Sequence, residues 1–216
     1  MKGIIICVAG AKGAIGSSLV LATLGLNKGK DYNKYLVTNN LTSFPNTKNI
    51  VFTGWDVKKT TFLEEIKSNE LISDHPFLEE NQKHLKKLTI FQAPVKGKFS
   101  DKINMIRKDM DKIRKKYPGY QPILVNVLPT SEHEIVGKTY EQIFSNEQKL
   151  VDVVYVMAAI EEGIPILNFT PNKIEVEPII SEATKRGLPM AGRDGKTGQT
   201  YIKMVLASAL RARNLY

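Results

Sequence analysis

A ten-residue stretch near the end of the chain has the composition of a ligand-binding loop. Residues 191–200 read Ala-Gly-Arg-Asp-Gly-Lys-Thr-Gly-Gln-Thr, so three glycines stand among Arg193, Asp194 and Lys196. Glycine lets a backbone turn tightly and approach a ligand closely. A fixed lysine ammonium can stabilise negative charge that develops on a substrate oxygen. A glycine-rich surface turn would have the same composition, so the neighbouring elements must decide between the two interpretations.

Those neighbouring elements predict where this loop lies in the fold. Residues 187–191 are apolar and predict a buried strand, and residues 201–213 are apolar at helical spacing. In an open α/β sheet, a loop that leads from a strand to a helix lies where ligands bind. The stretch is therefore predicted to carry its charges into a binding site.

A second glycine-rich turn lies close to the amino terminus. Residues 3–9 are β-branched and apolar, as in a buried parallel strand. Glycines follow at positions 10, 13 and 16, ahead of an apolar run of helical character. In a dinucleotide-binding turn the first glycine permits the bend, the second admits the pyrophosphate and the third lets the helix pack on the strand. The residues predicted to bind the pyrophosphate are Gly10, Ala11, Lys12, Gly13, Ala14, Ile15 and Gly16.

The ribose of such a cofactor usually needs an acidic residue at the end of the second strand. A strand predicted at 35–38 ends instead in Asn39 and Asn40, whereas the strand at 50–53 runs into Gly54-Trp55-Asp56. Asp56 is therefore either the ribose ligand, supplied from a third strand, or the cap of the next helix. The 2′-phosphate of NADP would need an arginine that is missing after the second strand. NAD is the expected cofactor.

The remaining chain repeats strands and helices. Further strands are predicted at 122–128 and 164–169, with a buried helix at 151–162 between them. The alternation predicts an α/β, Rossmann-like, doubly wound parallel sheet in a single domain over residues 1–216. Polar residues follow most of its strands, which favours a cofactor-dependent enzyme over a structural protein. The other predicted helices are at 176–186 and, in a helical insertion over 59–120, near 60–69, 76–88 and 101–116.

Composition narrows the class of protein. The 216 residues are 42% hydrophobic and 25% charged, and the one cysteine, Cys7, suits a reducing compartment, so a cytoplasmic location is expected. Apolar runs are too short to span a membrane. The net charge of +9 lies partly in residues 107–116, which mix both signs as a solvated helix face does. We therefore expect no nucleic-acid partner, and the three isolated histidines predict no metal site.

Taken together, the motifs resemble the myo-inositol-1-phosphate synthase family. The resemblance is carried by the first glycine-rich turn, the Gly54-Trp55-Asp56 strand end, Thr130-Ser131-Glu132 and the long blocks at 158–171 and 192–200. That family converts glucose 6-phosphate to inositol phosphate with tightly held NAD, through oxidation, enolisation, aldol cyclisation and reduction. The resemblance implies the same cofactor and a sugar-phosphate substrate for this chain.

The resemblance also implies roles for individual residues. Lys196 would stabilise charge or carry a proton beside the substrate, and Lys203 would assist it. Asp194 would lie near the nicotinamide, and Asn168 would contact substrate. Thr130 and Ser131 would contact the cofactor.

Two features depart from the family pattern. The family continues into a further catalytic and tetramerisation region, which implies a homo-oligomer or a complementary carboxyl-terminal chain here. The first turn also lacks the asparagines common in the family. Alternatives therefore stay open: a non-catalytic NAD-binding module, or another NAD-dependent oxidoreductase or epimerase acting on a sugar phosphate. A short-chain dehydrogenase is disfavoured because no tyrosine has a lysine four residues on.

Overall fold

The computed structural model describes residues 2–28, 49–70, 73, 77–195 and 198–213, and for 198–201 it describes the backbone alone. The predicted strand at 35–38, Asn39, Asn40 and Lys196 lie outside these residues. Within them, no helix combines the length and the apolar character that a membrane crossing requires.

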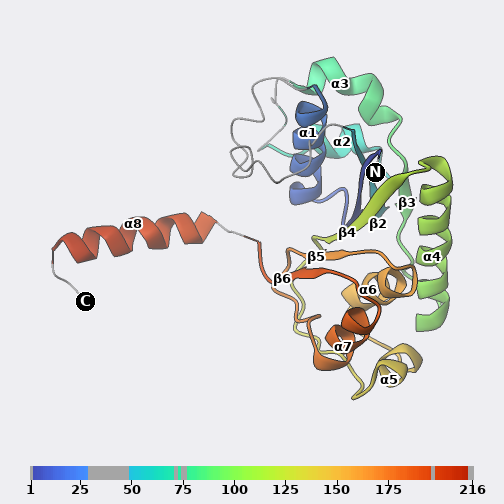
Figure 1. Ribbon diagram of the computed structural model, residues 1–216. Helices are drawn as coiled ribbons and strands as arrows, with labels where there is room; N and C mark the ends of the chain where they lie inside the picture. Colours follow the sequence, from blue (N-terminus) through green and yellow to red (C-terminus); the bar gives the residue numbers. More distant parts are fainter. Residues whose placement is uncertain (1, 29–48, 71–72, 74–76, 196–197, 214–216) are drawn as a thin grey trace.

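The core of the fold is a six-stranded parallel sheet with strand order β3-β2-β1-β4-β5-β6 (Figure 1). This confirms the α/β doubly wound fold, because the order runs outward in both directions from β1. All five pairings are parallel, and β1 is paired along its length with both β2 and β4. The strands are β1 (Gly3–Ala9), β2 (Ile50–Asp56), β3 (Ile90–Gln92), β4 (Tyr120–Asn126), β5 (Ile166–Asn168) and β6 (Met190–Gly192).

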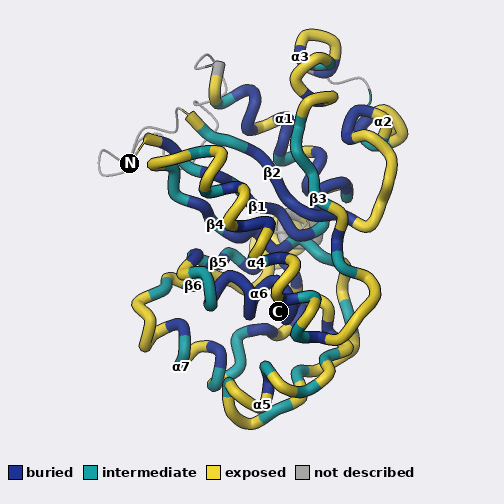
Figure 2. Tube along the Cα trace, turned by 90° about the vertical axis from the view of Figure 1, so that its right-hand side faces the viewer, coloured by how far each residue is buried: buried dark blue, intermediate teal, exposed yellow. Residues whose placement is uncertain are grey.

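Helices cover the two faces of this sheet unequally. On one face, α1 (Ala14–Lys28), α2 (Phe62–Lys67) and α3 (Phe77–Lys86) pack over a core that includes Val8 and Phe52. On the other face, α4 (Phe99–Lys116), α6 (Asp152–Glu161) and α7 (Glu177–Lys185) pack over a core that includes Ile5 and Cys7. The short α5 (Tyr140–Ser145) lies beside α7. Cores therefore form on both faces, but Ile6 of β1 and Ile123 of β4 are only partly buried on the α1 face, and β1 and β4 show both buried and intermediate colours in Figure 2.

Two elements differ from the sequence-based expectation. Residues 59–120 were expected to be a helical insertion, but β3 lies within them and pairs with β2. With three residues before Ala93-Pro94, β3 is too short to give an alternating pattern. The expected buried strand at 187–191 is β6. Among the described residues β6 pairs with β5 alone and forms an edge of the sheet, and Ala191 and Gly192 are exposed.

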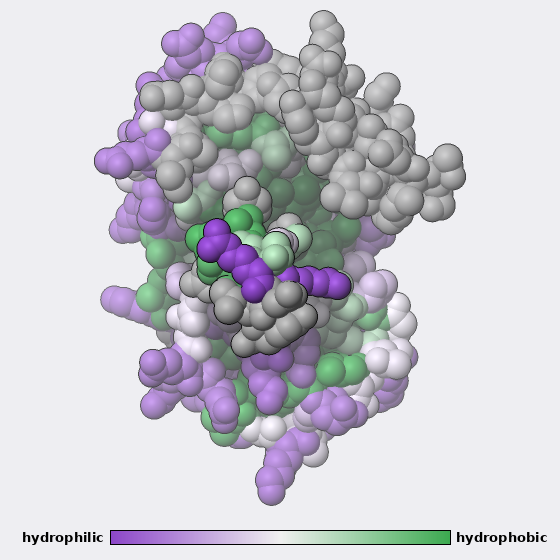
Figure 3. Space-filling model, turned by 90° about the vertical axis from the view of Figure 1, so that its left-hand side faces the viewer, coloured by the Kyte–Doolittle hydropathy of each residue, from purple (hydrophilic) through white to green (hydrophobic). Residues whose placement is uncertain are grey.

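The last helix, α8 (Gly198–Ala212), projects from the body of the molecule (Figure 1). Its residues 202–212 are exposed, including Ile202, Val205, Leu206 and Leu210, which lie on one face at helical spacing. Figure 3 views the molecule from the side on which α8 projects, with apolar side chains gathered on the surface behind the helix. An apolar cavity of about 290 Å³ opens beside α1, β4 and β5.

Candidate dinucleotide and substrate site

The first glycine-rich turn has the geometry that its spacing predicts. Gly10 has a φ of 87°, in the region that favours glycine, and its N–H donates to the Trp55 carbonyl at 3.0 Å. A Cβ at Gly16 would stand 2.2 Å from the Ala11 carbonyl oxygen, so only glycine allows α1 to begin this close to the turn. A Cβ at Gly13 would meet only the Gly10 carbonyl oxygen, at 3.4 Å, and otherwise open space. The turn is therefore open at the position that admits a pyrophosphate.

The amino terminus of α1 is suited to an anion. The first-turn N–H groups of a helix have no intrahelical partners, and the helix dipole favours negative charge there. The first turn of α1 carries no acidic residue. Ala14 and Ile15 are exposed at this end, so a phosphate can reach their backbone.

Asp56 lies where a dinucleotide-binding fold usually places its acidic residue. It ends β2, the strand next to β1, and is 7% exposed. Its Oδ2 accepts from the Lys12 N–H at 2.7 Å, and its Oδ1 accepts from the Lys58 N–H at 2.9 Å. The helix-cap alternative is wrong, because α2 begins at Phe62 and Thr61 caps it. A carboxylate retains lone pairs for a ribose hydroxyl beyond these two bonds, so the ribose role stays a prediction.

Lys12 ties the glycine-rich turn to the segment after β2. Its Nζ donates to the Lys58 carbonyl at 2.7 Å and to the Thr60 carbonyl at 2.5 Å. The Lys58 ammonium and the Thr60 hydroxyl in turn both bind the carboxylate of Glu65. Burial alone would raise the pKa of Glu65, but these hydrogen bonds outweigh it and hold that pKa below its usual value. In this structure the lysine of the turn thus binds protein carbonyls.

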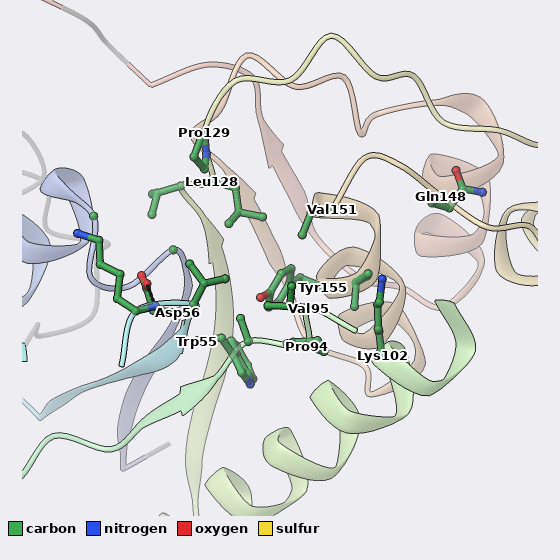
Figure 4. Close-up of a pocket in the computed structure, with 17 residues that line it drawn as sticks. Trp55, Asp56, Pro94, Val95, Lys102, Leu128, Pro129, Gln148, Val151 and Tyr155 are labelled. Carbon is green, nitrogen blue, oxygen red and sulfur yellow. Dashed lines mark hydrogen bonds between the residues drawn. The ribbon is translucent and has the colours of Figure 1, made fainter. Parts of the chain in front are cut away.

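A cavity of about 340 Å³ opens beside this turn (Figure 4). Its walls come from the carboxyl ends of β2, β3 and β4 and from the start of α6. Most lining side chains are apolar, which suits the flat base of a nucleotide. The charged or amide side chains in the lining are those of Asp56, Lys58, Lys102 and Gln148. The labelled lining residues are Trp55, Asp56, Pro94, Val95, Lys102, Leu128, Pro129, Gln148, Val151 and Tyr155.

The ends of β4 and β5 are joined by a buried polar network. The Asn126 amide, which is fully buried, donates to Asp152 Oδ1 at 2.7 Å and to Asn168 Oδ1 at 3.1 Å. Asn172 Nδ2 donates to the same Asp152 oxygen at 2.9 Å. Thr170 donates through its hydroxyl to Asn168 Oδ1 at 3.0 Å. The sequence motifs identified only Asn168 as a site residue. Asn126 and Asp152 could have been found as polar residues inside apolar segments, whereas Thr170 and Asn172 follow β5 in a polar loop.

Asn168 is fully engaged in this network. It is 3% exposed, and its Nδ2 donates to the Asn172 carbonyl at 3.0 Å and to Glu175 Oε1 at 2.9 Å. Its predicted contact with substrate stays a prediction, since the side chain would have to release one of these bonds. In this structure Asn168 links the end of β4 to the segment that follows β5.

The loop after β6 is anchored to the same region. The Gly195 N–H donates to the Phe169 carbonyl at 3.1 Å, and Arg193 Nε lies 3.5 Å from Glu175 Oε2. Asp194 is exposed at this loop. The described part of the loop therefore sits against the end of β5, while Lys196 lies outside the described residues.

The remaining predicted residues divide between the cleft and α8. Thr130 is exposed after β4, and the Ser131 N–H donates to Asn172 Oδ1 at 2.8 Å, which links this loop to the network. Lys203 is exposed on α8 and is not brought to the cleft, so its assisting role stays a prediction. Among the described residues, no group of three or more His, Cys, Asp or Glu side chains is placed to hold a metal ion.

Comparison with known proteins identifies the family. The model of the NAD-binding family described as myo-inositol-1-phosphate synthase matches residues 62–211, most of the chain. The chain belongs to the myo-inositol-1-phosphate synthase family. NAD is therefore its cofactor. The described residues fit this cofactor, because the turn is open at Gly13 and the adjoining cavity has the apolar lining that a flat base requires.

The relatives match over most of this chain. It is 25% identical over 210 residues to "Inositol-3-phosphate synthase 1" of Plasmodium falciparum, covering 85% of this chain and 35% of that protein. It is 26% identical over 220 residues to "Inositol-3-phosphate synthase" of Candida glabrata, covering 85% of this chain and 40% of that protein. The chain thus spans well under half the length of these relatives.

A solved structure has the same fold. The crystal structure of inositol-3-phosphate synthase from Caenorhabditis elegans aligns with a TM-score of 0.75 at 16% identity, over 94% of this chain and 51% of that chain.

Proposed function

We propose that this chain forms the NAD-binding part of an enzyme that converts glucose 6-phosphate to inositol phosphate. One observation carries the proposal: the dinucleotide cleft and the polar ends of β4, β5 and β6 meet at a single edge of the sheet. The names of the relatives support it. When bound, NAD would supply hydride transfer from and to the substrate.

The residues around the first turn bind and orient the cofactor in this proposal. The N–H groups at the start of α1 hold the pyrophosphate. Asp56, fixed by the Lys12 and Lys58 N–H groups, accepts from a ribose hydroxyl. The apolar walls after β3 and β4 exclude water from one side of the cofactor. Each group is held in place by the protein itself, so cofactor binding requires little rearrangement.

The network at β4 and β5 positions the substrate side. Asn126 joins the ends of β4 and β5 through Asn168 and ties both to Asp152 at the start of α6, and Asn168 contacts the substrate. Glu175 accepts a hydrogen bond from Asn168 and forms an ion pair with Arg193, so the network also orients the loop after β6.

Lys196 stabilises the negative charge that develops on the substrate oxygen during enolisation. Its place in a glycine-rich loop at the end of a strand, beside Asp194, supports this role. A fixed cation that faces a developing oxyanion contributes about 3 kcal/mol or more to catalysis, about a hundredfold in turnover.

The test is inositol phosphate formation from glucose 6-phosphate and NAD, followed by NMR, in the native assembly with any further chain it contains. Lys196→Ala should lower turnover about a hundredfold and leave the Kd for NAD unchanged. Lys196→Arg should not restore turnover, since a planar guanidinium does not replace a compact ammonium. Lys185→Ala is the control, because Lys185 is an exposed lysine on α7.

Two results would contradict parts of this proposal. Wild-type turnover with alanine at position 196 would refute the role of that lysine. An assembly that binds NAD but forms no inositol phosphate would refute the reaction and favour a non-catalytic NAD-binding module.

A further inference from the structure

Tyr155 carries a hydroxyl that opens onto the cavity and bonds no described residue. The residue lies in α6 and is 2% exposed, yet its hydroxyl makes no hydrogen bond with any residue that the structure describes. Figure 4 shows the hydroxyl directed into the cavity of about 340 Å³. The hydroxyl is therefore free to donate to an acceptor on a ligand in this cavity, and a typical hydrogen bond of this kind contributes about 0.5–1.5 kcal/mol.

The phenol is held in position by its neighbours. Its ring packs on Trp55 with centroids 5.6 Å apart, and the Trp55 indole N–H donates to Asp109 at 3.2 Å. Burial, followed by the charges of Asp56 and Asp152, raises the pKa of Tyr155 above its usual value. The hydroxyl is therefore neutral at physiological pH and available as a donor.

The surroundings of this hydroxyl indicate the ligand chemistry. Pro94, Val95 and Val151 give apolar walls, and Asp56 stands at the side of the glycine-rich turn. A ligand whose ribose lies at Asp56 would place its base between these walls. A purine base has flat apolar faces and ring nitrogens that accept hydrogen bonds.

We propose that the Tyr155 hydroxyl donates a hydrogen bond to the adenine base of the dinucleotide. Tyr155 is then a specificity-determining residue of the cofactor site. The apolar side chains contact the faces of the base and contribute affinity, but they do not distinguish its hydrogen-bonding groups. This inference rests on the NAD-binding role of the cleft and adds the residue that recognises the base.

The experiment compares Tyr155→Phe with Tyr140→Phe. Tyr155→Phe removes only the unbonded hydroxyl, so the thermal midpoint of the free protein should be unchanged or higher. Its Kd for AMP and for NAD should rise about two- to twelvefold, in line with one lost hydrogen bond. Nicotinamide mononucleotide, which lacks adenine, should bind both proteins equally. Tyr140 donates to Glu161 at 2.9 Å outside the cavity, so Tyr140→Phe should lower the thermal midpoint and leave AMP affinity unchanged.

Several outcomes would overturn the proposal. One is an unchanged AMP affinity in Tyr155→Phe while the wild-type protein binds NAD; the cofactor site then stands and only the role of Tyr155 falls. If Tyr155→Phe weakened the binding of AMP and of nicotinamide mononucleotide by the same factor, the hydroxyl would not recognise the adenine base. If the wild-type protein binds neither AMP nor NAD, the cofactor assignment fails together with this inference.

Discussion

Replacing Gly13 by valine tests whether the first turn holds the pyrophosphate. A Cβ at this position meets only the Gly10 carbonyl oxygen, at the ordinary contact distance of 3.4 Å, and otherwise points into open space. The fold should therefore accept the side chain, while a phosphate that approaches the turn should not. A charge-assisted hydrogen bond is worth about 1.5–3 kcal/mol, so the loss of one such bond raises the Kd for NAD about ten- to a hundredfold.

The chain offers its own reporter and control for this measurement. Trp55 is the only tryptophan and lines the cavity, so its fluorescence should respond to NAD, and calorimetry gives an independent Kd. Gly16→Ala should behave differently, because its Cβ would stand 2.2 Å from the Ala11 carbonyl oxygen. Overpacking of this kind costs about 1–3 kcal/mol, which lowers the thermal midpoint by several degrees. A folded Gly13→Val protein whose Kd stays within about twofold of wild type would refute the pyrophosphate assignment.

Three further outcomes follow from the structure. Asp56 should repel the 2′-phosphate of NADP, so calorimetry should show tighter binding of NAD than of NADP. Asp56→Ser should bring the two Kd values closer together, and equal affinities in the wild type would contradict the role of Asp56. Burial raises the pKa of Cys7 from 9.0 to about 12, so the unfolded state loses its proton first and stability should fall between these pH values, by about 1.4 kcal/mol per pH unit. Urea midpoints from pH 8 to pH 11 should show this slope, and Cys7→Ala should lack it. Asn126→Asp would set a carboxylate against that of Asp152, so the thermal midpoint should fall sharply at pH 7 and recover partly near pH 5.

Much of the architecture could be predicted because its signals are local. A buried strand followed by glycines at 10, 13 and 16 specifies a strand, a turn and a helix within about 25 residues. The helix at 152–161 is apolar on all sides, so it must be buried, and it packs between the sheet and the neighbouring helices. The short β3 gave no such signal, because three residues do not establish a period.

The site could be predicted only in part, since its contacts join distant segments. Asn126 and Asp152 stand 26 residues apart in the chain and meet only because β4 and α6 pack together. The sequence left open whether Asp56 binds ribose or caps a helix, because the choice depends on where α2 begins. Lys12 was predicted to contact phosphate, but its bonds to the Lys58 and Thr60 carbonyls depend on how the segment after β2 folds back.

The exposure of α8 has a consequence for cooperativity. The helix has 15 residues, and its apolar face is exposed along residues 202–210. Isolated helices of this length are marginal in water, since most helical stability in proteins comes from tertiary packing. Its amide hydrogens should therefore exchange through local opening, at rates unrelated to the global unfolding that protects β1 and β4. Calorimetry of the sheet would not report on α8, and a single free energy of unfolding cannot describe both.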